Sequence, residues 1–119
     1  MDVEWHGSHL RAHVFDGTDS VPVSIAMWKL LAEQCREYSA QRLLVLEDLA
    51  GSVDVADIGT VVAAIVRLGF AGIRIAFVEL RDDMSVNEHG EILALEQGVT
   101  VCVFGNESQA RRWLLYGVD

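Results

Sequence analysis

Short, largely apolar runs that alternate with longer amphipathic segments constrain the fold of this chain more than any other feature. The runs are residues 43–46, 73–80 and 99–104. A short apolar run between turn-forming residues is typical of a strand that is covered on both faces. Because strands that alternate with helices pair in parallel through right-handed crossovers, the pattern predicts an α/β fold.

Four segments have apolar side chains at the three- and four-residue spacing of an amphipathic helix. They are residues 21–41, 55–68, 85–97 and a last segment between Asn106 and Gly117. In the first segment Trp28 and Ala32 belong to the apolar face, and Pro22 falls in the first turn, where a helix tolerates proline. Each apolar run is therefore followed by a helix.

Residues 2–6 and 9–15 predict two further strands, joined by a tight turn at Gly7 and Ser8. The expected order is ββαβαβαβα, in one domain that spans residues 1–119. We expect a mixed, mostly parallel sheet of five strands flanked by four helices, with the first hairpin as an antiparallel edge and the three apolar runs as central strands. The predicted core contains Trp28, Val45, Ile65, Ile75, Val101 and Trp113.

The charge of the chain argues against two classes of partner. The 119 residues carry a formal net charge of -9, and Lys29 is the only lysine, so the chain repels nucleic-acid phosphates and anionic lipid. The longest apolar stretch, residues 61–66, is far shorter than a bilayer span, and the acidic amino terminus lacks the basic start of a signal peptide. We expect a cytoplasmic protein without nucleic-acid binding or membrane insertion; the sequence leaves a homodimer open.

The cysteines and histidines do not have the spacing of a metal or redox site. Cys35 and Cys102 each lie inside an apolar-periodic segment without a C-x-x-C motif, which predicts two buried thiols. His6, His9 and His13 have no matching cysteine or carboxylate, so we expect ordinary surface or edge histidines. The sequence therefore predicts no metal and no cofactor.

Motifs for catalysis are also missing. Glu47 and Asp48 are neighbours in a predicted strand, and adjacent strand residues point to opposite faces, so we expect them to end the strand rather than to form an acid–base pair. Ser52 lacks the G-x-S-x-G elbow of a nucleophilic serine, and Gly51 and Gly59 do not complete a dinucleotide-binding motif. We expect no catalytic residues and a protein that is not an enzyme.

The closing block TVCVFGNESQARRWLLYG, together with the predicted order of elements, resembles the SpoIIAA-like branch of the STAS superfamily, which comprises the domains of sulfate transporters and anti-sigma-factor antagonists. The residues that carry the resemblance are Phe104, Asn106, Ala110, Trp113 and Leu114. The resemblance covers nearly the whole chain and implies a STAS-like domain from a bacterium. It also implies a non-enzymatic module that binds another protein.

A second point of resemblance is the block LLVLEDLAGSVDVADIG, where partner-switching members carry an Asp-Ser-Ser-Gly tetrapeptide. The matching positions here are Ala56, Asp57, Ile58 and Gly59. In this register Asp57 replaces the regulatory phosphoserine, and a serine kinase cannot act on it. A carboxylate in a first helical turn is also favourable for the helix dipole, so the sequence leaves open whether Asp57 caps a helix or stands in for a phosphoserine.

A parallel sheet gathers loops and helix amino termini at the carboxyl ends of its strands, where partners and ligands bind. The residues expected at this edge are Asp48, Gly51, Ser52, Asp57, Arg81 and Asn106. We expect a protein partner, with a basic patch that complements the acidic surface, to bind there and along the exposed face of the second helix.

An alternative function is a carrier for a small hydrophobic ligand or a lipid. The SpoIIAA-like branch is also compared with the CRAL-TRIO lipid-binding fold. Met27, Trp28 and Met84 are side chains that suit an adaptable apolar pocket between sheet and helix.

Overall fold

The computed structural model describes residues 1–81 and 84–117. Its sheet has the strand order β1-β2-β3-β4-β5, which is the order of the chain. β1 runs antiparallel to β2, and the later neighbours are parallel. The strands are β1 (Asp2–Trp5), β2 (Leu10–Thr18), β3 (Arg42–Ala50), β4 (Arg74–Glu79) and β5 (Thr100–Phe104).

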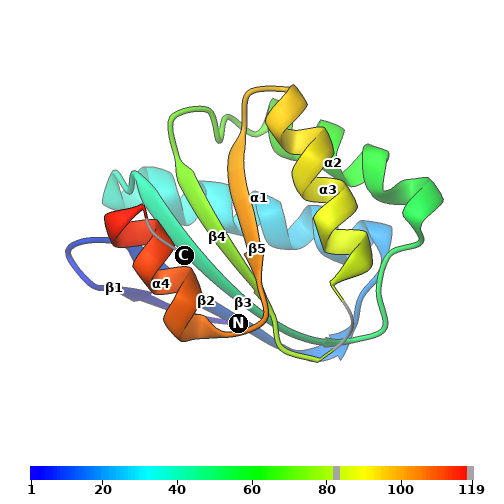
Figure 1. Cartoon of the computed structure of the whole chain (residues 1–119), viewed down its shortest axis with the longest axis horizontal. Helices are drawn as coiled ribbons and strands as arrows, with labels where there is room; N and C mark the ends of the chain where they lie inside the picture. The colour runs from blue at the N-terminus through cyan, green and yellow to red at the C-terminus, as the bar shows by residue number, and fades with distance from the viewer. Residues whose placement is uncertain (82–83, 118–119) are drawn as a thin grey trace.

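The helices lie in two layers on opposite sides of the sheet (Figure 1). α1, α2 and α3 pack on one face, which we call the α1–α3 face, and α4 packs on the other, the α4 face. The helices are α1 (Val21–Tyr38), α2 (Ile58–Arg67), α3 (Ser85–Glu96) and α4 (Glu107–Tyr116), with a 3-10 turn (Val55–Asp57) before α2.

The chain-ordered sheet explains this division. In a right-handed crossover, the side on which the next parallel strand is added determines which face of the sheet the connecting helix covers. From β2 to β5 each strand is added on the same side of the previous one, so α1, α2 and α3 share a face. Only α4, which follows the last strand, is free to pack on the other face. The strand order between β2 and β5 never reverses, so the sheet has no switch-point crevice of the doubly wound type.

Each face has its own apolar core. Alternate residues of one strand point to opposite faces. In β3, Leu43 belongs to the core of the α1–α3 face and Leu44 to the core of the α4 face. The core of the α1–α3 face is the larger and includes the fully buried side chains of Phe70 and Leu31. The core of the α4 face consists of Leu44, Leu46, Ala76, Val78, Phe104, Ala110 and Leu114.

The structure confirms the predicted α/β class, the ββαβαβαβα order, the mixed sheet of five strands and the four helices in the residues it describes. One prediction about the sheet is wrong, because β5 is an edge strand and not a central one. α3 packs beside this edge, and the Val103 amide donates a hydrogen bond to Glu91 Oε2 at 2.9 Å. The Glu91 carboxylate of α3 thus accepts the hydrogen bond of a Val103 amide that a further strand would otherwise bind.

Four predicted boundaries differ from the structure by three residues or more. The second strand, expected to end at residue 15, extends to Thr18. The first helix ends at Tyr38 rather than at residue 41, because Ser39 takes a left-handed conformation with φ of 52°. The strand expected over residues 43–46 extends to Ala50, because it pairs with β2 as far as Thr18. Residues 55–57 form a 3-10 turn, and α2 proper begins at Ile58.

The core prediction is correct for four of its six residues. Trp28, Val45, Ile65 and Ile75 are buried. Val101 and Trp113 are only half-buried, although both pack against a core cluster. Their positions explain this difference. Val101 lies on the edge strand. Trp113 lies on α4, which is the only described helix on its face of the sheet.

Candidate functional site

A cavity of about 70 Å³ lies on the α1–α3 face, between the sheet and the helices α2 and α3. Its floor comes from β3, β4 and β5, and one end is closed by α1. Most of its lining is apolar. The apolar lining residues are Trp28, Val53, Ile58, Val61, Val62, Ile65, Ile75, Phe77, Val86, Ala94, Val99, Val101 and Val103.

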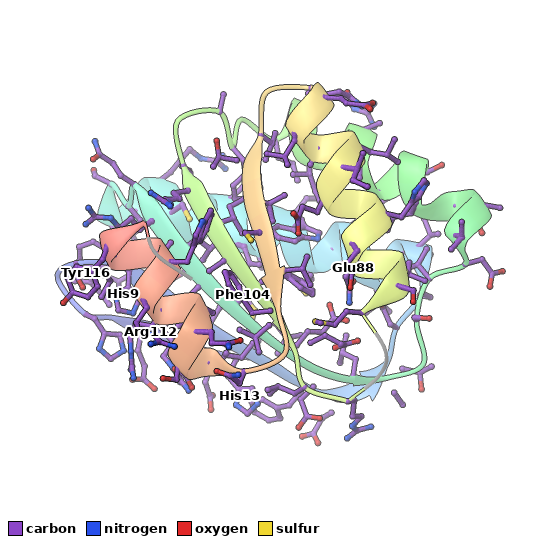
Figure 2. The ribbon with its side chains drawn as sticks, viewed as in Figure 1. His9, His13, Glu88, Phe104, Arg112 and Tyr116 are labelled. Carbon is purple, nitrogen blue, oxygen red and sulfur yellow. The ribbon has the colours of Figure 1, made fainter. Side chains whose placement is uncertain are left out.

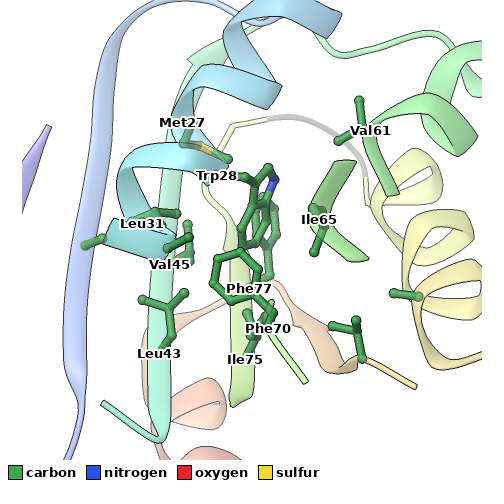
Figure 3. Packing of buried hydrophobic residues seen from close by; sticks show 14 of the residues in the cluster. Met27, Trp28, Leu31, Leu43, Val45, Val61, Ile65, Phe70, Ile75 and Phe77 are labelled. Atoms are coloured by element: carbon green, nitrogen blue, oxygen red, sulfur yellow. The ribbon is translucent and has the colours of Figure 1, made fainter. Parts of the chain in front are cut away.

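The aromatic side of this cavity is a packed group of rings. Trp28 stacks on Phe77 with ring centroids 6.0 Å apart and meets the edge of Phe70 at 5.5 Å. Figure 3 shows these rings together, with Val61 and Ile65 of α2 across from them. Because each ring is held by another, this wall is rigid, and its apolar surface is presented without a rearrangement.

The outer wall of the cavity is α3. Gly90 faces α2 there: a Cβ at this position would stand 3.3 Å from Ile58 Cγ1, closer than an ordinary contact. The glycine therefore lets α3 approach α2. Among the described residues of α3 only Ala94 is fully buried, and its N-cap residue Met84 makes no capping hydrogen bond with its side chain. α3, which forms this wall, thus has fewer buried residues than α1, α2 or α4.

Two buried glutamates lie side by side at the carboxyl ends of the central strands. Glu47 of β3 and Glu79 of β4 are register partners and are 3% and 4% exposed. Register partners in a parallel sheet point to the same face, and Glu47 lines the cavity. From the sequence we considered Glu47 together with Asp48, its chain neighbour, and did not predict this pair.

A signal for the glutamate pair does exist in the sequence. Both strands read arginine, four apolar residues, glutamate: Arg42 to Glu47 and Arg74 to Glu79. Aligning the two runs on their arginines places the glutamates opposite one another, which is the register of the structure. A carboxylate that ends a run covered on both faces is buried rather than solvated, since the helices extend over the strand end.

The remaining polar residues of the lining come from the same edge of the sheet as Glu47, because they lie just after the carboxyl ends of β2 and β3 or in the first two turns of α1 and α3. They are Asp19, Ser24, Ser52, Asn87 and Glu91. Asp19 Oδ1 accepts hydrogen bonds from the Ser24 hydroxyl at 2.7 Å and the Ser20 amide at 2.9 Å. Glu91 is held by the Val103 amide. Within the part of the chain that the structure describes, no lysine, arginine or histidine lines the cavity.

The six residues expected to form a partner site lie at or after the carboxyl ends of β3, β4 and β5, and the structure brings two of them into direct contact. Asp48 pairs with Arg81 at 2.8 Å, on the face opposite to Glu47. Asn106 accepts a hydrogen bond from the Gln109 amide and caps α4. Ser52 lines the cavity, and Gly51 turns the chain before it with φ of 69°.

Asp57 is the sixth of these residues, and the structure bears on its capping role. It precedes α2, but its side chain makes no capping hydrogen bond, because its backbone is already helical, with φ of -103° and ψ of -6°. An N-cap side chain normally reaches the helix amides from an extended backbone. The carboxylate is exposed and retains only its favourable position at the amino end of the helix.

The predicted apolar pocket is correct for only one of its three residues. Trp28 lines the cavity. Met27 is buried in the same core but is not part of the lining, because it lies on another side of α1. Met84 lies against Gly105, at the turn between β5 and α4.

The three histidines of the first hairpin, His6, His9 and His13, gather on the α4 face, and one of them is not the surface residue we expected. His9 is 5% exposed, stacks on His6 with centroids 5.0 Å apart, and its Nδ1 lies 2.8 Å from the Ser8 hydroxyl. Burial, followed by the charge of His6, lowers the pKa of His9 below its ordinary value. Figure 2 shows His9 and His13 beside α4.

The ion pair that joins the hairpin to α4 is bidentate. Arg11 donates to both carboxylate oxygens of Glu107, at 2.8 and 3.1 Å. This hydrogen bonding is the main reason why the pKa of Glu107 is lowered and that of Arg11 is raised. In the described residues no three histidine, cysteine, aspartate or glutamate side chains gather in the arrangement of a metal site.

The two thiols differ in their surroundings. Cys35 is buried in the core of the α1–α3 face, and burial raises its pKa to about 11. Cys102 is only half-buried, on the edge strand β5, which corrects the prediction that both thiols are buried.

Comparisons of the chain with protein-family models, with curated proteins and with solved structures find no significant match. No helix among the described residues combines the length and the apolar character that crossing a bilayer requires.

Proposed function

We propose that this protein is a non-enzymatic binding module that holds a small, largely apolar molecule in the cavity of the α1–α3 face. The observation that carries the proposal is the lining: apolar and aromatic walls with the polar groups gathered at one end. Binding sites for small molecules have this composition, because the apolar walls supply affinity and a few polar groups fix the orientation.

The volume of the cavity limits the size of the ligand. About 70 Å³ exceeds the roughly 10–15 Å³ that one water needs, so there is room for several heavy atoms. It is far below the roughly 300–1,000 Å³ of sites for drug-sized ligands. The proposal therefore favours a short-chain or single-ring molecule over the lipid that a CRAL-TRIO-like carrier would hold.

The test uses 1-butanol as a neutral probe, with binding followed by ligand-observed NMR. A molecule of five heavy atoms cannot exceed about 7 kcal/mol of binding free energy, so a Kd near 1 mM, about 4 kcal/mol, is a realistic expectation. Val86 lines the cavity from α3, and Val86→Trp fills it and is expected to abolish binding. Ile92→Trp is the matched control, because Ile92 is 56% exposed on the same helix and is not part of the lining.

Native mass spectrometry of the protein purified from a bacterial lysate complements the probe experiment. A retained small molecule supports the proposal directly. Absence of a retained molecule, together with no 1-butanol binding by a folded wild-type protein, contradicts it.

A second candidate function is the binding of a protein partner, as the resemblance to the SpoIIAA-like branch of the STAS superfamily implies. What supports it is the agreement of the ββαβαβαβα order with that branch and the exposed turn before α2, where Val55 is 54% exposed between Asp54 and Asp57. An exposed apolar side chain among carboxylates suits a partner with a basic rim.

Pull-down experiments test this second function. Asp57→Ser removes the charge without removing a capping hydrogen bond. We therefore expect a loss of stability no larger than about 0.3–1 kcal/mol, which is what an exposed carboxylate gains at a helix amino terminus. If Asp57 stands in for a phosphoserine, the substitution changes which proteins are recovered from a lysate. If wild type and variant recover the same proteins, Asp57 has no such role.

A further inference from the structure

The mouth of the cavity lies at its polar end. Among the described lining residues only Ser52 is exposed, and Asn87, in the first turn of α3, is half-buried. Ile75 and Val99 line the cavity near the amino ends of β4 and β5, and both are buried. A ligand with one polar group therefore enters with its apolar part first and keeps the polar group at the mouth.

Ser52 and Asn87 are the polar side chains of the mouth that remain available to a ligand. Within residues 1–81 and 84–117, neither the Ser52 hydroxyl nor the Asn87 carboxamide makes a hydrogen bond. A hydroxyl and a carboxamide both donate and accept hydrogen bonds. The head group that complements them best is one that also donates and accepts.

The carboxyl groups at this end of the sheet are already engaged. Asp19 accepts hydrogen bonds at the start of α1, and Glu91 accepts one that fastens α3 to β5. Glu47 and Glu79, which are register partners, also interact with other groups of the protein. A cationic head group would have to share or displace these partners, and moving a charge out of water without a partner of its own is costly.

An anionic head group meets a different obstacle. Asp19, Glu47 and Glu91 line the cavity, and the described lining contains no lysine, arginine or histidine. The chain as a whole carries a charge of -9, so no surplus of distant positive charge offsets this end. Like charges brought together cost free energy, and such repulsion is a common source of specificity. The lining thus discriminates against a carboxylate.

Resting on the function proposed above, we propose that the ligand of this cavity is an uncharged molecule whose head group, a hydroxyl or a primary amide, both donates and accepts hydrogen bonds. The acidic mouth excludes the carboxylic acid of the same length. The head group bonds to Ser52 and Asn87, and the apolar body packs against Ile65, Phe77 and Ala94, which line the cavity farther from the mouth.

The first experiment compares four probes with the same four-carbon skeleton at pH 7: 1-butanol, butyramide, butyrate and n-butylammonium. Binding to the wild-type protein is followed by ligand-observed NMR. We expect 1-butanol and butyramide to bind with similar affinities, and both to bind at least about ten-fold more tightly than either charged probe. Ser52→Ala is expected to weaken 1-butanol binding about two- to ten-fold, the effect of losing one hydrogen bond. Ser108→Ala, at an exposed position of α4, is the matched control and is expected to change nothing.

The second experiment changes the charge at the mouth. Asn87→Lys places an ammonium group among the lining residues, so we expect butyrate to bind this variant at least as tightly as 1-butanol does. His89→Lys is the matched control, because His89 is exposed on the same helix outside the lining. It also replaces a side chain that is largely neutral at pH 7 with a lysine, and we expect it to leave butyrate excluded.

The outcomes separate the head-group proposal from the binding function. Butyrate or n-butylammonium binding to the wild type as tightly as 1-butanol overturns the head-group proposal, whereas 1-butanol binding that Val86→Trp abolishes leaves the binding function intact. Butyrate binding by His89→Lys equal to that by Asn87→Lys also overturns the head-group proposal, because net charge alone would then explain the exclusion. If circular dichroism shows that Asn87→Lys does not fold, the wild-type probe series decides.

Discussion

The α1–α3 face and the α4 face are built from the same strands, because alternate residues of β3, β4 and β5 point to one or the other. On the α1–α3 face three helices of different directions meet over the sheet, and their junction leaves the cavity. On the α4 face one helix lies directly on the strands, and an ion pair anchors it to β2. A junction of several helices creates binding space, whereas a single helix on a sheet closes it.

The largest expected effect lies in the core of the α1–α3 face. Phe70 is 0% exposed, and its ring meets the edge of Trp28. Phe70→Ala is expected to lower the free energy of unfolding by about 3–5 kcal/mol, the usual cost of removing a buried ring. Chemical denaturation measures this loss, and a value below about 1 kcal/mol would contradict the rigid aromatic wall described for this face.

The corresponding ring of the α4 face should matter less. Trp113 is half-buried, and the Arg74 guanidinium lies 4.1 Å above its ring. Trp113→Ala is expected to cost about 2 kcal/mol, from partial burial and a cation–π contact of about 0.5–1 kcal/mol. Trp113→Phe keeps a ring below Arg74 and is expected to retain most of this energy. A loss equal to that of Phe70→Ala would make the two faces equivalent.

A smaller and pH-dependent effect is expected from the ion pair of the α4 face. The bidentate hydrogen bonds of Arg11 hold the pKa of Glu107 below its ordinary value. A carboxylate with a lowered folded-state pKa contributes stability above the ordinary glutamate pKa, and this contribution disappears as the pH falls through the folded-state pKa. Glu107→Gln is therefore expected to cost about 1–2 kcal/mol at pH 7 and progressively less at acidic pH.

The pH dependence of this cost is measured by denaturation of both proteins from pH 7 downward. Glu88→Gln serves as the control, because Glu88 is exposed on α3 and lies far from α4 (Figure 2). A constant difference between wild type and Glu107→Gln over this range would show that the ion pair does not link stability to pH.

Thiol labelling compares the two faces without altering their stability. Burial raises the pKa of Cys35 to about 11, so at pH 8 only about one thiol in a thousand is ionised. The surrounding core residues also block the access of a reagent to this thiol. Cys102 is half-buried on the edge strand. We expect Cys102 to react first in the native protein and Cys35 only on unfolding, with mass spectrometry of the labelled peptides as the measurement. Equal rates would contradict this order.

The sequence predicted what depends on local pattern. The apolar runs and the three- and four-residue spacings identified every described strand and helix, because burial dictates both periodicities. The sequence also placed Trp28 in an apolar pocket, and Trp28 lines the cavity. It placed Ser52 at the carboxyl-end edge of the sheet as part of a partner site, and Ser52 lines the same cavity. It did not predict that β5 is an edge, since edge position depends on which strands pair, and pairing is not a local property.

The candidate site depends on register, which no single segment specifies. Glu47 and Glu79 are 32 positions apart in the chain and become neighbours only when β3 and β4 align. For Asp57 the sequence left a capping role open, because a carboxylate before an apolar helix has the pattern of a cap. The 3-10 turn at Val55–Asp57 gives Asp57 a helical backbone, from which its side chain does not reach the helix amides.

The chain-ordered sheet has a consequence for synthesis. Because neighbouring strands are also consecutive in the chain, each strand can pair as soon as it leaves the ribosome, and the α1–α3 face can be covered stepwise. Among the described elements only α4 covers the other face, so Leu44, Leu46 and Val78 stay open to water or to other chains until residues 107–116 have been made. A nascent or truncated chain that stops before Glu107 would present this apolar strip to chaperones and to aggregation.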